Sequence, residues 1–206
     1  MTSIRSLSSR WVAWAFAAAY LAVSAVVGTV LLTMPKTDVT DAGTQTTYIS
    51  EDQPEIMVSP APAGFQWVRG PAGMQTVIPY GWQSVAAGQP GAMRAVDPSD
   101  PGRIVGFGGA KALSDDIVRT HIGYEESFAA RTKAYHRVDL NSATYGGHKA
   151  VEWQFTHQDG GGLQRVQALY WLVDDVEYFV FVSGPDQRWS SRMKPVYDAM
   201  VANSSP

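Results

Sequence analysis

The longest apolar stretch of the chain runs from Trp11 to Thr33 and contains no charged residue. About 20 consecutive apolar residues are enough for a helix to cross the hydrocarbon core of a bilayer. The pattern therefore predicts a transmembrane helix over this segment, preceded by a short head at residues 1–10. Arg5 and Arg10 before the segment, against Lys36 alone just after it, favour a cytoplasmic head and an extracytoplasmic C-terminal part.

Two other interpretations of this segment fit its sequence less well. A cleaved signal peptide has an apolar region of about 7–15 residues that ends in a small-x-small site. Here the apolar run is longer, and residues 30–35 (VLLTMP) place bulky side chains where small ones are required. A core helix of a globular domain is amphipathic, and this segment is not. An uncleaved single-pass anchor is the favoured interpretation, which predicts a cell-membrane protein.

Residues 34–63 lack apolar periodicity and are rich in Thr, Ser, Asp and Pro. This composition predicts a flexible extracytoplasmic linker. At an r.m.s. span of about 5–6 Å × √n, it would separate the membrane from the domain that follows by roughly 30 Å. Within it, residues 55–58 (EIMV) are open to a second interpretation, as an edge strand or as a contact with a neighbouring molecule.

Residues 64–203 alternate apolar and polar positions in short runs, which predicts an extracytoplasmic domain that begins with β-strands. Residues 79–82 (PYGW) end one of these strands, because proline cannot donate a ladder hydrogen bond. Residues 97–102 (DPSDPG) are a dense turn signal between two others. The predicted strands of this first half are residues 65–68, 74–78, 92–96 and 103–107.

A helix is predicted from Ser114 to about Lys133. Ser114 is the expected N-cap, and the acids Asp115 and Asp116 would lie in the first turn, where the helix dipole favours negative charge. Apolar residues recur behind them at the three-to-four spacing of an amphipathic helix.

Three further strands are predicted at residues 149–157, 163–173 and 176–182. The second and third become apolar on both faces, and strands of that kind need layers above and below them. The expected fold class is therefore α+β, with an antiparallel sheet sandwiched by helices. A closing helix is expected from Asp186, where Pro195 either kinks it or begins a second helix.

Composition and charge exclude several classes of function. The chain is 45% hydrophobic and 11% aromatic, enough to build a core. All 19 acidic residues and 14 of the 16 basic residues follow the apolar segment, a balance of −5. This balance predicts no nucleic-acid partner. The absence of cysteine excludes disulfides, thiol catalysis and cysteine zinc sites.

The histidines predict no metal site and no cofactor. His121, His136, His148 and His157 lack the i, i+4 or H-x-H spacing of metal ligands on one element. A rim site shared by His157 and Asp159 is the alternative. His121 lies on the apolar stripe of the predicted helix, and we expect a core histidine with a buried partner rather than a base.

Other motifs also favour structural roles, so no catalytic residue is predicted. No G-x-S-x-G nucleophile motif occurs. Residues 106–111 (GFGGAK) invite comparison with a phosphate-binding loop, but they lack its spacing and are expected to be a flexible strand exit. The acidic pairs are assigned to a helix cap, a solvated helix face and a hairpin turn: Asp115-Asp116, Glu125-Glu126 and Asp174-Asp175. A hydrolase would need acids that meet only in space.

The order of hairpin, helix, long antiparallel strands and closing helix resembles the PsbP-like fold, as found in actinobacterial envelope lipoproteins and single-pass membrane proteins. The resemblance covers roughly Gly64 to Ala202. It is carried by Gly64-Phe65, Trp67-Val68, residues 77–82 (VIPYGW), residues 147–153 (GHKAVEW), Trp189 and Tyr197. It implies an α/β/α sandwich used for binding or assembly, generally without catalysis. The lipidated cysteine of the lipoproteins is missing, and the segment Trp11 to Thr33 stands in its place.

The sequence thus favours a non-enzymatic single-pass membrane protein whose domain binds or stabilises a protein partner, as an accessory subunit of a cell-envelope membrane complex. A second hypothesis is a sensor or carrier of a small apolar ligand, held by aromatic residues in a cleft between sheet and helix. Those aromatic residues are Trp82, Trp153, Tyr170 and Trp171. An envelope hydrolase is the third hypothesis.

Overall fold

The computed structural model describes residues 60–206. The predicted head, the predicted transmembrane segment at residues 11–33 and nearly all of the predicted linker lie outside this part of the chain. Within residues 60–206, no helix combines the length and the apolar character that crossing a membrane requires.

The described residues form nine strands, two α-helices and three single helical turns. The first half comprises β1 (Phe65–Arg69), η2 (Pro71–Gly73), β2 (Gln75–Pro79), β3 (Gln83–Ala86), β4 (Ala92–Asp97), β5 (Asp100–Lys111) and α2 (Ile117–Ala129). The second half comprises β6 (His136–Tyr145), β7 (His148–Asp159), β8 (Gly162–Val173), β9 (Val176–Pro185), η3 (Asp186–Arg188), the π-helical turn η4 (Trp189–Met193) and α3 (Lys194–Ala202).

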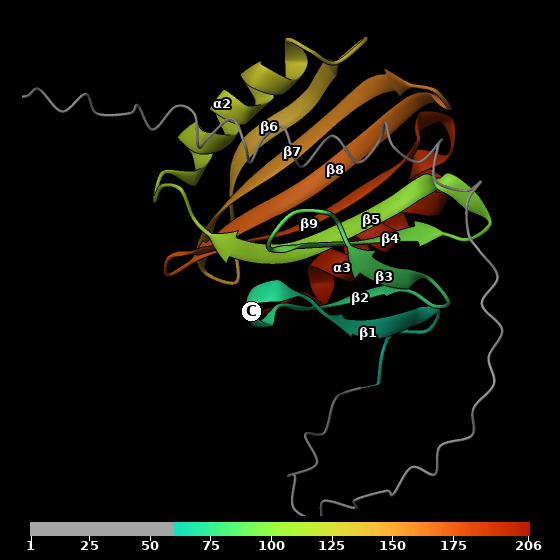
Figure 1. Ribbon diagram of the computed structural model, residues 1–206, viewed down its shortest axis with the longest axis horizontal. Helices are drawn as coiled ribbons and strands as arrows, with labels where there is room; N and C mark the ends of the chain where they lie inside the picture. Colours follow the sequence, from blue (N-terminus) through green and yellow to red (C-terminus); the bar gives the residue numbers. More distant parts are fainter. Residues whose placement is uncertain (1–59) are drawn as a thin grey trace, which may run out of the picture.

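Seven strands form one sheet in the order β3-β4-β5-β9-β8-β7-β6, and every neighbouring pair is antiparallel. The hairpin β1-β2 is a separate two-stranded sheet. Its second strand, β2, is joined to the C-terminus, since Gln75 and Ser205 exchange two backbone hydrogen bonds of 2.8 and 3.0 Å. Figure 1 shows the long strands β5 to β9 crossing the centre of the domain, with the hairpin at one side.

The sheet separates two cores because successive side chains of a strand point to opposite faces. On one face α2 contacts β6 and β7. On the other face α3 contacts β9 and the hairpin strand β2. The core on the α2 face contains Ile117, Phe128, Val151, Trp153, Phe155, Val166, Tyr170 and Phe179. The core on the α3 face contains Met74, Ile78, Trp82, Phe107, Leu169, Trp171, Val180, Trp189, Met193 and Met200.

The predicted antiparallel sheet covered on both faces is therefore confirmed, and so are the seven predicted strands. Two strands, β3 and β6, were missed. β6 is an edge strand with a register shift between Arg137 and Asp139, which interrupts the alternation that identifies strands in a sequence. Val138 in this irregularity is 43% exposed, so no apolar face marks the segment.

The helix boundaries correct the prediction for α2. This helix begins at Ile117 and ends at Ala129 rather than about Lys133, and Asp116 rather than Ser114 is its N-cap, accepting a hydrogen bond from the Arg119 amide. Ser114 instead accepts from the Asp116 amide. At the C-terminal end a new helix begins at Lys194, with Pro195 in its first turn, after a separate π-helical turn. This agrees with the second of the two alternatives for Pro195.

Candidate binding site

The turn between β4 and β5 is built around a buried carboxylate. Asp97 is 6% exposed and accepts hydrogen bonds from the Ser99 amide (2.7 Å) and the Ser99 hydroxyl (2.6 Å). Its second oxygen lies 2.5 Å from Nη2 of Arg103, whose Nε lies 3.3 Å from Asp100. Burial alone would raise the pKa of Asp97, but the Ser99 hydrogen bonds and the Arg103 charge outweigh it, so this pKa is lowered. Arg103 is thereby fixed in place.

The second part of the site is the π-helical turn η4. Its ends, Trp189 and Met193, are 5% and 1% exposed, and they anchor the turn on the sheet. Close packing here requires Gly184 on β9, because a Cβ at that position would lie 2.6 Å from Cγ of Met193. Arg188 and Arg192 are exposed beside these anchors. Single π-helical turns occur frequently at functional sites.

The two parts line a cavity of about 290 Å³ that is open to solvent. The residues that line it are Ser99, Asp100, Arg103, Pro185, Arg188, Arg192 and Met193. Three guanidinium groups against one carboxylate make this cavity positively charged, although the chain as a whole carries a net charge of −3. We refer to it below as the arginine-lined cavity.

The arginines of the cavity differ in their partners. Arg103 is committed to Asp97 and Asp100. Among the described residues, neither Arg188 nor Arg192 has an acidic partner within ion-pair distance. The neighbouring Asp186 is already paired with Arg165 of β8 at 2.6 Å. Two guanidinium groups are thus available to an anionic ligand.

A second group of ionisable residues lies between α2 and the sheet. Nδ1 of His121 lies 2.9 Å from the carbonyl of Ile117, and Nε2 lies 3.8 Å from Oε1 of Glu177 on β9. Burial lowers the pKa of His121 to about 4, against a smaller opposite effect of the Ile117 carbonyl. Burial raises the pKa of Glu177 to about 7. Both shifts favour a neutral histidine beside a protonated carboxyl group.

This pair is packed among aromatic rings. The imidazole ring lies 4.0 Å from the ring of Tyr170 and 5.3 Å from that of Tyr124. Burial and the nearby Glu177 raise the pKa of Tyr124 to about 12. His121 is 1% exposed, which confirms the predicted core histidine. No pattern in the sequence shows that Glu177, far away in the chain, is its neighbour.

The aromatic residues considered for an apolar ligand do not line one cleft. Trp82 and Trp171 belong to the core on the α3 face, whereas Trp153 and Tyr170 belong to the core on the α2 face. The sheet lies between the two pairs. All four are at most 9% exposed, and each is part of the packing of its own core.

The remaining histidines do not converge. His136 and His148 are exposed at the ends of β6 and β7, whereas His157 is buried, with its ring 6.3 Å from that of Phe128. Asp159, considered with His157 for a rim site, accepts hydrogen bonds from Gly161 and Gln164. Within residues 60–206, no group of three or more His, Cys, Asp or Glu side chains is arranged to hold a metal ion.

Two interpretations of motifs were wrong. Residues 106–111 are neither a phosphate-binding loop nor a flexible strand exit; they are the end of β5, and they pair with β9. Glu125 does not lie on a solvated helix face, because it is 4% exposed. It accepts hydrogen bonds from Tyr135 (2.9 Å) and, through both oxygens, from Arg137 (3.1 Å each). The residues Asp174-Asp175 form the predicted hairpin turn between β8 and β9.

The sequence pattern did not predict the arginines of the cavity. Arg103 lies about 85 residues before Arg188, and nothing in either segment shows that they meet. The one usable signal was the pattern R-x-x-x-R at residues 188–192, in a segment that was expected to be a packing helix. Its charged face could have been singled out.

The fold of this chain is PsbP-like. It is similar to the solution structure of cyanobacterial PsbP (CyanoP) from Synechocystis sp. PCC 6803, with a TM-score of 0.55, 15% identity, and coverage of 72% of this chain and 95% of the other. LpqN of Mycobacterium tuberculosis, described as involved in cell envelope biogenesis, matches with a TM-score of 0.48 and 11% identity, over 68% and 90% of the two chains. Among curated proteins, none matches this chain.

The sequence places the chain more narrowly within this fold. Residues 66–205 match the family described as "Serine/threonine kinase C-terminal domain". The match spans β1 to the residues just after α3, the whole sheet and both of its covering layers included. The chain belongs to this family.

Proposed function

We propose that this chain is a single-pass membrane protein whose extracytoplasmic domain binds a protein partner without catalysing a reaction. The arginine-lined cavity is the surface through which the domain recognises that partner. The observation that carries the proposal is the pair of exposed guanidinium groups, Arg188 and Arg192, which lack an acidic partner within residues 60–206.

The proposed recognition role is supported by how the site is built. Arg103 is held by two carboxylates, and η4 is anchored through Trp189 and Met193. A binding surface gains affinity when its framework is already fixed, because less entropy is lost on association. The fold also supports the role, because the resemblance to PsbP-like domains implies a domain used for binding or assembly.

The family description is consistent with this role. It names domains at the C-terminal end of serine/threonine kinases. We infer that a domain of this family recognises a partner and that any catalytic activity belongs to a different domain or protein. The uncharged run from Trp11 to Thr33 would hold the domain at the membrane and, by the charge bias around it, on the extracytoplasmic side.

Affinity purification in mild detergent from native membranes tests the proposal. We expect a stoichiometric companion protein with the wild-type chain, and its loss with Arg188→Gln/Arg192→Gln. Arg119→Gln/Arg131→Gln is the matched control, since it removes two exposed charges from α2 and the residue after its cap. Recovery of the bare monomer from native membranes would contradict the proposal.

A further inference from the structure

We propose that the arginine-lined cavity binds an acidic peptide segment of the partner, with side-chain carboxylates of that segment held by Arg188 and Arg192. The inference rests on the proposed function and specifies the chemistry of its partner. It starts from the contrast between the arginines that have acidic partners and those that do not. Arg69, Arg94 and Arg131 also form no ion pair within residues 60–206, but only Arg188 and Arg192 of these five line the cavity.

Four arginines of the domain are each paired with a carboxylate: Arg103, Arg119, Arg137 and Arg165. The side chains of Arg188 and Arg192 form no ion pair with the rest of residues 60–206. A guanidinium group presents a planar fork of N–H donors that matches the two oxygens of a carboxylate. The geometry therefore leaves two such forks open beside the cavity.

The two open forks lie on the same side of the domain. Arg188 and Arg192 are four positions apart across a single helical turn, a spacing at which side chains are neighbours. Both line the same cavity. Arg103 behind them stays with Asp97 and Asp100, which offset its charge, so the charge available to a ligand is that of Arg188 and Arg192.

The size of the cavity favours a peptide over a single ion. A volume of about 290 Å³ is roughly ten times the volume of one water molecule in liquid water. One phosphate or sulfate ion would leave most of this space to water. The lining also offers more than charge: Pro185 and Met193 are apolar and can contact side-chain methylene groups, while Ser99 and Asp100 can accept hydrogen bonds from peptide N–H groups.

The charge of the whole domain argues against an anionic lipid surface as the ligand. The part of the chain after the apolar segment carries a balance of −5, so an extended negative surface is repelled by most of the domain. A short acidic segment contacts the cavity alone. It therefore experiences the local excess of arginine rather than the overall negative charge.

Fluorescence anisotropy of labelled hexaglutamate, titrated with the full chain in zwitterionic detergent, tests the inference, with hexaglutamine as the neutral control peptide. We expect saturable binding of hexaglutamate, no binding of hexaglutamine, and at least tenfold weaker binding by Arg188→Gln/Arg192→Gln. Each tenfold loss corresponds to about 1.4 kcal/mol, close to the lower end of the range of about 1.5–3 kcal/mol for a hydrogen bond to a charged group. Arg119→Gln/Arg131→Gln should bind within twofold of the wild type.

Three results would overturn the inference: equal weakening by the two double variants, competition by inorganic phosphate at the concentration of peptide carboxylates, or binding to phosphatidylglycerol vesicles with none to hexaglutamate.

Failure of the inference is distinguishable from failure of the proposed function. A companion that co-purifies equally with both double variants would preserve partner binding and exclude the cavity. Binding of hexaglutamate, with no companion protein recovered from native membranes, would preserve the acidic-peptide site and exclude the proposed partner.

Discussion

The domain holds two clusters of ionisable side chains that differ in charge: one favours neutral side chains, and the other is positively charged. The pair His121 and Glu177 lies between α2 and the sheet, with the histidine 1% exposed. The arginine-lined cavity lies between the β4-β5 turn and η4, with Arg188 and Arg192 exposed. Burial lowers the pKa of His121 and raises that of Glu177, which favours the neutral form of both side chains, whereas guanidinium groups make the cavity positively charged.

The comparison separates a packed pair from a binding site. A histidine near a carboxylate is a common reason to suspect catalysis. Here the shifts have burial as their largest cause, and aromatic rings contact the imidazole. Guanidinium groups with no internal partner, beside a cavity with a fixed framework, indicate recognition more strongly than perturbed pKa values do.

The largest predicted effect is a pH-dependent loss of stability when one member of the pair His121 and Glu177 is replaced. In the wild type the two members balance each other. Between pH about 4.5 and 6.5 the unfolded pair holds one proton on histidine, and the folded pair holds one proton on glutamate. The numbers of bound protons are equal, so this pair should add no slope to the free energy of unfolding.

Glu177→Gln removes one half of that balance. The remaining His121 has a lowered pKa, so its contribution is present above pH 6.5 and is lost as pH falls toward about 4. Relative to the wild type, stability should fall by about 1.4 kcal/mol per pH unit, roughly 3 kcal/mol over the window. Denaturant unfolding at several pH values measures this. Parallel curves for variant and wild type would show that the pair does not exchange a proton.

His121→Leu should give the opposite slope. The raised pKa of Glu177 means that its contribution is present below pH 4.5 and is lost as pH rises through about 7. Stability relative to the wild type should therefore decrease with rising pH, on top of a constant loss from the altered packing. The same titration series reports it, and a slope of the same sign as that of Glu177→Gln would contradict the assignment.

The next largest effect comes from the ion pair between Glu125 and Arg137. Arg137→Gln leaves Glu125, whose side chain is 6% exposed, with the hydroxyl of Tyr135 as its one remaining side-chain partner in the described residues. Breaking a fully buried pair costs about 3–5 kcal/mol, and because Arg137 is 53% exposed we expect about 2 kcal/mol. Arg119→Gln, from an exposed pair, is the control and should cost less than about 0.5 kcal/mol.

These effects also show what could be predicted from the sequence. The strands β7, β8 and β9 were predictable, because apolar residues on both faces require covering layers. The edge strand β6 was not, since a register shift and an exposed Val138 remove its pattern. Neither Glu177 nor the meeting of Arg103 with Arg188 was predictable, because their proximity depends on the order of strands in the sheet.

A smaller effect is expected at Gly184, which packs against Met193 of η4. Gly184→Ala would place a Cβ 2.6 Å from Cγ of the buried Met193, so the anchor of η4 must shift. We expect about 1 kcal/mol of destabilisation from overpacking, together with weaker binding of hexaglutamate. Gly123→Ala is the control, since a Cβ there meets no atom within 4 Å. Unchanged peptide binding by Gly184→Ala would show that the position of η4 does not matter for recognition.

The smallest effect should come from the arginines proposed to bind the partner. Arg188→Gln and Arg192→Gln should each change the free energy of unfolding by less than about 0.5 kcal/mol, because both side chains are exposed and lack an acidic partner in residues 60–206. Thermal unfolding measures this. A loss above 1 kcal/mol would mean that these residues stabilise the fold, and the contrast with the buried pair would disappear.

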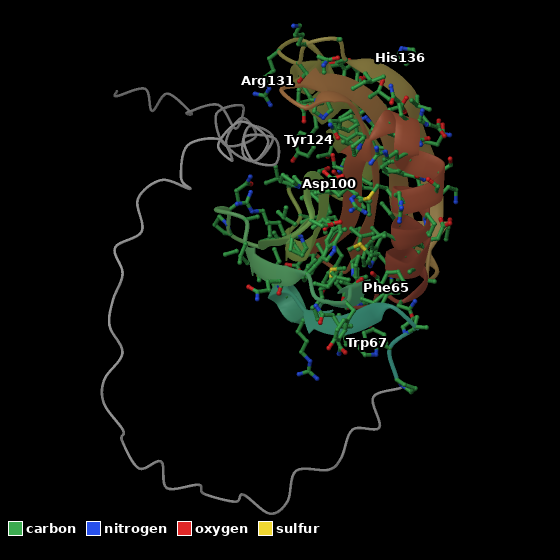
Figure 2. The ribbon with its side chains drawn as sticks, turned by 90° about the vertical axis from the view of Figure 1, so that its right-hand side faces the viewer. Phe65, Trp67, Asp100, Tyr124, Arg131 and His136 are labelled. Atoms are coloured by element: carbon green, nitrogen blue, oxygen red, sulfur yellow. The ribbon has the colours of Figure 1, made fainter. Side chains whose placement is uncertain are left out.

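Site-specific photo-crosslinking in native membranes tests the central claim most directly. A photoreactive residue at Gln187, next to Arg188, should crosslink to a protein partner. The same residue at Lys133 should not; Lys133 follows Arg131, which Figure 2 shows at one end of the domain, well away from Asp100 of the cavity. Crosslinks from Lys133 with none from Gln187 would contradict recognition through the arginine-lined cavity.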